Sequence, residues 1–206
     1  MAYIVETSMN EDLLPKGYFE DEPPAWSKPW RPVPADAYAW VKTTAGYPIP
    51  PDRGAPTTAV IRQNWIRLPD FFSLKQNVGV STVFKEIVEG LEPGVHQFFP
   101  LQVRRQDGGA IEGGYWLFVI CNLIDTAIDP ERSTVKVKEA APGSAYWHYA
   151  PTDGRVIAVK KAVIRGVHAW IDRRYQSMFF SDALVAALDA KNIAGLVERN
   201  YVEETE

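Results

Sequence analysis

Hydrophobic and polar positions alternate regularly only after about residue 57 of this chain. The stretch 133–139 alternates strictly, which places Val135 and Val137 on one face and Lys136 and Lys138 on the other. Six further stretches have the β-branched and aromatic composition of strands: 57–68, 95–105, 114–124, 155–166, 168–172 and 196–203. The pattern therefore predicts a sheet-rich body.

Two segments have helical periodicity instead, and a serine precedes each of them. Ser81 and Ser181 are expected to cap their helices because a serine hydroxyl accepts a hydrogen bond from a free amide of the first turn. Gly90 is expected to end the first segment in the left-handed conformation, and Gly195 is expected to end the second. The predicted buried faces are Val83, Phe84, Ile87 and Val88 in the first helix, and Leu184, Ala187 and Leu188 in the second.

The strands 95–105 and 114–124 are predicted to form a hairpin. The glycine-rich stretch 106–114 joins them, with Asp107-Gly108 as the expected tight turn. The run from Tyr115 to Cys121 is apolar on both faces, so we expect it to be a central and nearly fully buried strand. Cys121 is the single cysteine and is interpreted as a core thiol.

The N-terminal quarter of the chain has a different composition. Ten of the sixteen prolines fall within residues 15–56, where they interleave with tryptophan and tyrosine. Because proline removes backbone donors, we expect residues 1–58 to form an irregular Pro/aromatic-rich extension that packs on a body of residues 59–206. The predicted fold class is α+β: a single domain with a mainly antiparallel sheet, a few helices and this irregular segment.

Charge and hydropathy narrow the class of partner. The net charge is −4, but residues 1–24 carry −5 and residues 203–206 carry −3, which leaves +4 for the rest. The body has no dense basic stripe, so nucleic acid is not the expected partner. The longest apolar run has seven residues and the N-terminus lacks a secretory pattern, so we expect a cytoplasmic protein without a membrane span.

No motif of cofactor, phosphate or zinc chemistry is present in the sequence, so no cofactor, metal site or catalytic residue is predicted. The three histidines, His96, His148 and His168, are isolated from one another and lie among aromatic residues. We interpret them as structural, because a histidine held by a backbone or carboxylate hydrogen bond is the commoner case. Arg173 and Arg174 are expected to be solvated, with anion binding as the rival interpretation.

Several stretches occur together in an order and spacing that resemble a known family. The first is 91–103, with Glu92, Pro93, Gly94, His96, Phe98, Phe99 and Pro100, and the last is 179–198, with Ser181, Asp182, Leu184 and Gly195. Over about residues 60–200 the chain resembles immunity-protein family eleven of bacterial polymorphic toxin systems. The resemblance implies a protein that neutralises a secreted toxin by binding it. It implies no catalytic residues.

The leading functional hypothesis is therefore a non-catalytic immunity protein whose partner is a cognate toxin. Two alternatives stay open: an enzyme or small-ligand protein using a cleft with His96, His148 or His168, and a scaffold subunit. The expected partner-binding residues lie in the proline- and tryptophan-rich arm: Glu20, Asp21, Glu22, Trp26 and Trp30. The sequence leaves the toxin's identity and the oligomeric state open.

Overall fold

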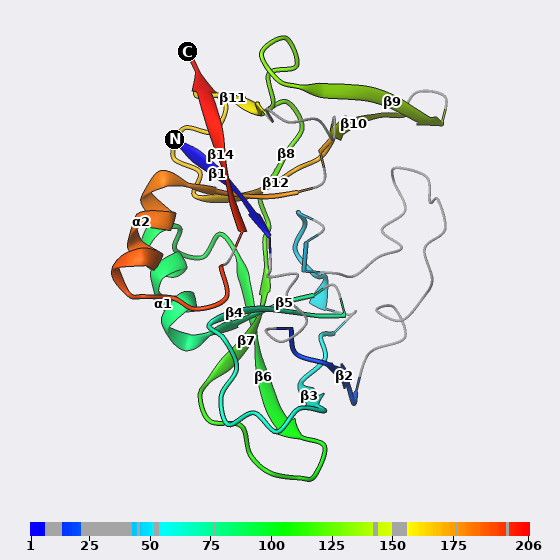
Figure 1. Cartoon of the computed structure of the whole chain (residues 1–206), viewed down its shortest axis with the longest axis vertical. Coiled ribbons are helices and arrows are strands. Elements are labelled where there is room, and N and C mark those ends of the chain that lie inside the picture. The colour runs from blue at the N-terminus through cyan, green and yellow to red at the C-terminus, as the bar shows by residue number, and fades with distance from the viewer. Residues whose placement is uncertain are drawn as a thin grey trace.

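Two mixed six-stranded sheets, two helices and a two-stranded ribbon make up the described chain (Figure 1). The computed structural model describes residues 1–6, 14–21, 43–44, 46–51, 54–75, 77–141, 144–149, 156–175, 177–196 and 198–206. The α+β class is confirmed. The sheets contain parallel as well as antiparallel pairs, and the proposed domain boundary at residue 58 stays a prediction.

The first sheet contains the predicted hairpin near its centre. In spatial order its strands are β2 (Gly17–Phe19), β3 (Thr58–Ile61), β6 (Gln97–Arg105), β7 (Tyr115–Val119), β5 (Asn77–Ser81) and β4 (Phe71–Leu74). β6 and β7 pair antiparallel, with Phe98 opposite Phe118, and Gly108 has the positive φ of 86° that the turn requires. β7 is a central strand between β6 and β5, as predicted.

The second sheet contains both ends of the chain. In spatial order its strands are β11 (Ala158–Lys160), β14 (Glu198–Thr205), β1 (Ala2–Glu6), β13 (Met178–Ser181), β12 (Ala169–Asp172) and β8 (Leu123–Ile124). Beside this sheet, β9 (Val135–Ala141) and β10 (Ser144–Tyr149) form the separate antiparallel ribbon. β1 pairs antiparallel with both β13 and β14, so the first strand of the chain lies inside the sheet.

The expectation of an irregular segment over residues 1–58 is wrong for two stretches. Ala2–Glu6 and Gly17–Phe19 are the strands β1 and β2. Each apolar stretch is too short to stand out against its acidic and proline-rich surroundings, and each gains its hydrogen bonds from strands distant in sequence. The tryptophan-bearing part of the arm, residues 22–42, lies outside the described residues.

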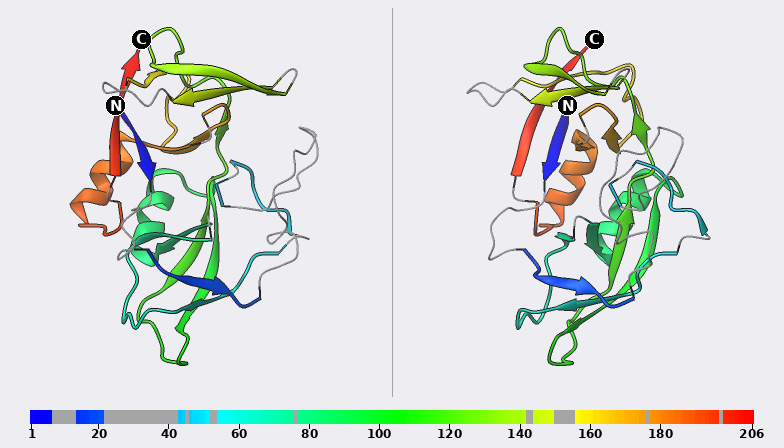
Figure 2. Two further views of the ribbon diagram at one scale, coloured as in Figure 1. Left: turned by 45° about the vertical axis from the view of Figure 1, so that its right-hand side comes forward. Right: turned by 90° about the vertical axis from the view of Figure 1, so that its right-hand side faces the viewer.

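A strand hairpin followed by a helix occurs once in each sheet. β4 and β5 lead into α1 (Thr82–Leu91), and β12 and β13 lead into α2 (Asp182–Ala190). The predicted caps are confirmed, because Ser81 Oγ accepts from Phe84 N at 3.3 Å and Ser181 Oγ accepts from Leu184 N at 3.2 Å. The two helices pack against each other, and all views place them along the same side of the molecule (Figure 2).

The helices close a core that both sheets share. Phe84 of α1 lies 5.7 Å from Phe118 of β7 and 6.1 Å from Phe180 of β13 between ring centroids, so one side chain packs against both halves. Leu184 and Leu188 of α2 are fully buried in the same cluster. The predicted inner face of α2 is confirmed at these two residues, whereas Ala187 is half-buried and Val185 is buried.

Two details of α1 differ from the prediction. Val83 is 39% exposed rather than buried, because it stands in the first turn, at the edge of the covered face. Gly90 does not end the helix: Glu92 N still donates to Val88 O at 2.8 Å, and the chain reverses at Gly94, which has φ of 71°. Helix α1 therefore continues past Gly90 to Leu91.

The run Tyr115–Cys121 is buried except at two positions. Trp116 is half-buried, and its Nε1 donates to Thr82 Oγ1 at 3.2 Å while Lys85 Nζ lies 5.0 Å from the ring centroid. Cys121 is also half-buried, and burial raises the pKa of its thiol. Helix α1 covers the Trp116 side of β7 incompletely, which the alternation of the strand alone does not reveal.

Gly195 lies at a close backbone crossing between the two halves. Its φ is 103°, and a Cβ at this position would lie 1.9 Å from the carbonyl oxygen of Phe71. Next to it, Phe71 N donates to Ala194 O at 3.0 Å. The loop after α2 therefore rests directly on the start of β4, which requires a residue without a side chain.

We expect Gly195→Ala to destabilise the protein by at least about 3 kcal/mol, because backbone strain adds to a clash with a carbonyl group. Gly166→Ala is the matched control: Gly166 has φ of 75°, but no atom lies within 4 Å of the added Cβ. Gly166→Ala is expected to lose only the energy needed to hold alanine in the left-handed conformation, about 1–2 kcal/mol. Urea denaturation measures the free energy of unfolding of both variants. Equal losses of stability would show that the close contact between Gly195 and Phe71 does not contribute.

Candidate functional site

Glu92 and His96 form a buried pair on the turn that follows α1. Glu92 is the C-cap residue of α1, and Gly94 bends the chain so that His96 returns toward it. His96 Nε2 lies 2.8 Å from Glu92 Oε2. The His96 side chain is 0% exposed and that of Glu92 is 5% exposed, so the pair is closed to solvent.

The hydrogen bond from Cys121 fixes the tautomer of His96. The backbone N–H of Cys121 donates to His96 Nδ1 at 3.2 Å, so Nδ1 is an acceptor. Nε2 then carries the hydrogen and donates it to Glu92. The imidazole thereby continues the hydrogen bonding of β7 beyond its last ladder residue, Val119.

The carboxylate of Glu92 connects the two sheets. Oε1 accepts from Asn122 Nδ2 at 3.0 Å, and Oε2 accepts from the backbone N–H of Ala169 in β12 at 2.9 Å. Asn122 Nδ2 also donates to Ala169 O at 3.0 Å. We call Glu92, His96, Asn122 and the Ala169 backbone the Glu92 network; it joins the α1 turn and the end of β7 to the first strand of the second hairpin.

The network stabilises the ionised form of Glu92. Burial by itself raises the pKa of the carboxyl group, but the hydrogen bonds from His96 and from the backbone of His168 and Ala169 outweigh it. The pKa is therefore lowered from its ordinary value of 4.5. The resulting stability is complete above pH 4.5 and is lost as the pH falls through the lowered pKa.

The side chains of the other candidate residues make their contacts outside this network. His168 Nδ1 lies 2.8 Å from the capping hydroxyl of Ser181, half-buried at the start of α2. His148 belongs to β10, in a stretch where only the backbone is described. Arg173 Nη2 donates to Tyr47 Oη at 2.9 Å and Arg174 Nε donates to Asp125 Oδ1 at 3.3 Å, so both guanidinium groups make protein contacts.

The described part of the acidic arm makes intramolecular contacts. Glu20 Oε1 lies 2.6 Å from Arg104 Nη2. The Asp21 carboxylate accepts from Thr57 N, Thr57 Oγ1 and Thr58 N, and although partial burial opposes it, these hydrogen bonds lower the pKa of Asp21. Asp21 thus holds the end of β2 against the start of β3, and Glu20 connects it to β6 through Arg104. Glu22, Trp26 and Trp30 lie outside the described residues.

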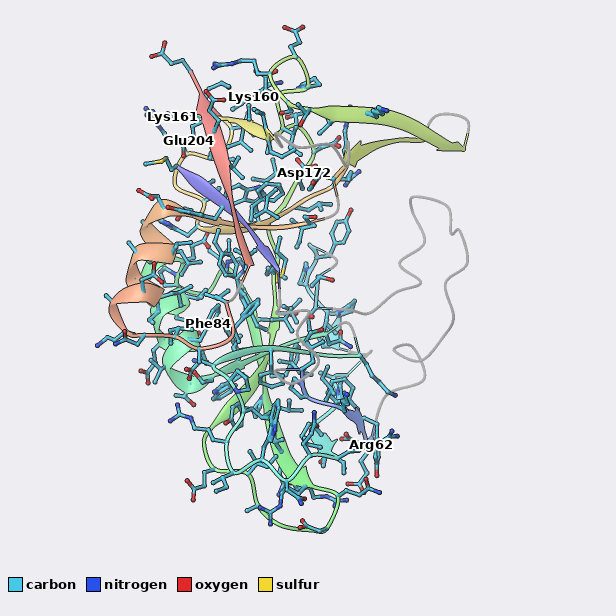
Figure 3. The ribbon with its side chains drawn as sticks, viewed as in Figure 1. Arg62, Phe84, Lys160, Lys161, Asp172 and Glu204 are labelled. Carbon is cyan, nitrogen blue, oxygen red and sulfur yellow. The ribbon has the colours of Figure 1, made fainter. Side chains whose placement is uncertain are left out.

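Asp172 is a buried carboxyl group that the sequence interpretation missed. It is 1% exposed; Oδ1 accepts from the backbone N–H groups of Arg174 and Tyr175, whereas Oδ2 has no hydrogen-bond partner among the described residues. Burial raises its pKa to about 6. It lines a pocket of about 110 Å³ together with Asp125, Thr126, Ile128, Pro130, Lys160 and Arg174, and Figure 3 labels Asp172 and Lys160 in this part of the molecule.

A larger hollow lies where the β3–β4 connection meets the loop after α2. It has a volume of about 900 Å³. We call it the Ile66 groove, and its lining residues are Asn64, Trp65, Ile66, Arg67, Leu68, Pro69, Asp70, Val83, Lys191, Asn192, Ile193 and Ala194. Strand periodicity gave no signal for this groove, because two connections distant in sequence form it.

The described residues form neither a metal site nor a membrane-spanning helix. Among the described residues, no three histidine, cysteine, aspartate or glutamate side chains converge as a metal site would require. Neither α1 nor α2 nor any other described helix is long and apolar enough to cross a membrane.

The fold and its buried polar residues define a sheet-rich protein. The Glu92 network within it connects the two sheets. Comparison with known families gives a match to the immunity protein family Imm11 over residues 25–202. The chain belongs to this family. We find no curated protein with a significant match to the chain.

We expect Glu92→Gln to lower the free energy of unfolding by about 3 kcal/mol at pH 7, because the amide NH₂ would replace one carboxylate oxygen and face either the Asn122 donor or the donors of His96 and Ala169. Glu89→Gln is the matched control on the same helix, since Glu89 is 41% exposed and pairs with Lys85 at the surface. Its expected change is below about 0.5 kcal/mol. Guanidinium denaturation measures the free energy of unfolding of both variants. If Glu89→Gln lost as much stability as Glu92→Gln, the stabilising role of the Glu92 network would be refuted.

Asp172→Asn should change stability in a pH-dependent way. The unfolded carboxyl ionises near 3.8 and the folded one near 6, so ionisation costs stability as the pH rises between these values. Relative to wild type, the variant should gain up to about 3 kcal/mol between pH 4 and pH 7.5. Thermal denaturation across this range checks the sign; a constant difference between the two proteins would show that Asp172 keeps an ordinary pKa.

Proposed function

We propose that this protein is a cytoplasmic bacterial immunity protein that neutralises a cognate polymorphic toxin by stoichiometric binding, without chemistry. The observation that carries the proposal is membership of the immunity protein family over residues 25–202. The geometry agrees with it. The pair with acid–base character, Glu92 and His96, is closed to solvent and has its hydrogen-bonding atoms engaged.

The enzyme alternative finds little support in the histidines. A general base must come within hydrogen-bond reach of a substrate, and the His96 side chain has no exposed surface. His168 does contact a serine hydroxyl, but that hydroxyl caps α2 through Leu184 N. The capping role accounts for Ser181 without a nucleophile. The scaffold alternative differs from the leading proposal in its partner, so a toxin-specific experiment separates the two.

Residues of the acidic arm remain part of the proposal as partner-binding residues: Glu20, Asp21, Glu22, Trp26 and Trp30. Glu20 and Asp21 stay accessible while they hold the end of β2 against β6 and β3 respectively, since Glu20 is 49% exposed and Asp21 is exposed. They would therefore fix the start of the arm as well as contribute negative charge near it. This double role predicts that their substitution affects folding and binding together.

The test is to co-express the chain with the toxin encoded beside its gene and to isolate the complex. We expect growth protection, a 1:1 complex, and toxin of unchanged mass and full activity after it is separated under denaturing conditions and refolded. His168→Gln should protect as well as wild type, because the proposal assigns no chemistry to His168. Protection at amounts far below the toxin, or a covalent change in the toxin, would establish an enzyme instead.

A further inference from the structure

We infer that the Ile66 groove is a toxin-docking surface, and that it receives an apolar side chain of the toxin with a carboxylate beside it. This inference rests on the proposed function and names the face that carries it out. It places a binding surface on the β3–β4 connection and the loop after α2, residues that are separate from the tryptophan-bearing arm.

The first observation is a concentration of exposed apolar surface. Ile66 is 64% exposed and Val83 is 39% exposed, and both line the same groove beside the half-buried Trp65. The other exposed large hydrophobic residues of the described chain, Met1, Val95, Val156 and Val163, do not line it. Apolar surface gathered around a hollow marks a binding site, whereas single exposed residues are ordinary.

The second observation is that both walls of the groove are held in place before any partner arrives. On one wall, Leu68 N donates to Tyr115 Oη at 2.8 Å, and Glu112 N donates to Ile66 O at 2.7 Å. On the other, Ala194 N donates to Asp70 Oδ2 at 3.1 Å, beside the close crossing of Gly195 over Phe71. A surface fixed in this way loses little conformational entropy on binding.

The third observation is the charge at the rim. Asp70 is the one carboxylate among the described residues that line the groove, and its two oxygens are engaged by Arg67 Nη2 at 3.2 Å and by Ala194 N. Arg67 is 63% exposed and Lys191 is exposed, so two cations face the solvent around the apolar floor. The complementary partner therefore carries a carboxylate next to its apolar side chain.

A neighbouring pocket extends the groove around the start of α1. Arg67 and Val83 line both hollows, and the second, of about 330 Å³, continues past Thr82 to Glu112, Gly113 and Gly114, so the carboxylate of the partner belongs on the Lys191 side. A partner segment that enters beside Ile66 can thus continue over the first turn of α1. The two hollows fit an extended stretch or loop of the toxin better than a single small molecule.

The experiment measures affinity for the purified toxin encoded beside the gene, by calorimetry. Ile66→Ala and Val83→Ala should each weaken binding by about tenfold or more, as truncation of a central apolar contact does. Val163→Ala and Val95→Ala are matched controls, since these residues are 37% and 40% exposed outside the groove. Lys191→Glu should slow association, with an effect that shrinks as salt rises. Melting temperatures should stay within about 2 °C of wild type because all these side chains lie at the surface.

The outcomes separate this inference from the proposed function. If wild type neither binds nor protects, the proposed function fails. If the wild-type protein binds the toxin and the groove variants bind it equally well, the proposed function stands. The inference that the toxin docks at the Ile66 groove is then overturned. Loss of binding only in Trp26→Ala and Trp30→Ala would assign docking to the arm. A groove variant that converts a dimer into a monomer in light scattering, with toxin affinity unchanged, would make the groove a self-interface and also overturn the inference.

Discussion

The structure depends on one buried carboxylate. Glu92 lies at the end of α1 and binds donors from His96, Asn122 and the β12 backbone, which belong to both halves of the molecule. An ionised carboxylate in the interior is tolerable only when its oxygens are hydrogen-bonded, and here three donors meet it. Because these donors come from elements far apart in sequence, the carboxylate is satisfied only when the two sheets are correctly placed.

The aromatic core and the polar network act together in this arrangement. Phe84 and Phe118 pack between the helices and the sheets, and the His96 ring meets Phe118 edge-on at 5.5 Å. Apolar packing supplies the non-directional part of the stability, whereas the Glu92 network fixes the alignment of the halves. The groove beside Ile66 depends on the same alignment, since its walls come from one connection of each half.

The sequence reveals the local elements better than their assembly. The caps at Ser81 and Ser181, the β6–β7 hairpin and the strands around Trp170 follow from periodicity and turn chemistry, because short-range interactions determine them. β1 was missed because its four apolar residues, Ala2 to Val5, become a strand only when β13 and β14 flank them. Glu92 and His96 were noted as part of a family-like stretch, but their partners Asn122 and Ala169 are 30 and 77 residues from Glu92 and carry no local signal.

Hydrogen exchange at the Ala169 and Cys121 amides tests the central claim most directly. Both amides donate to side chains of the Glu92 network rather than to a strand ladder. The account predicts that in the wild-type protein they exchange only with global unfolding, and that in Glu92→Gln both lose protection together. Rapid exchange of Ala169 in the wild type, with the neighbouring ladder amides of β7 and β13 still protected, would show that the carboxylate does not hold the halves together.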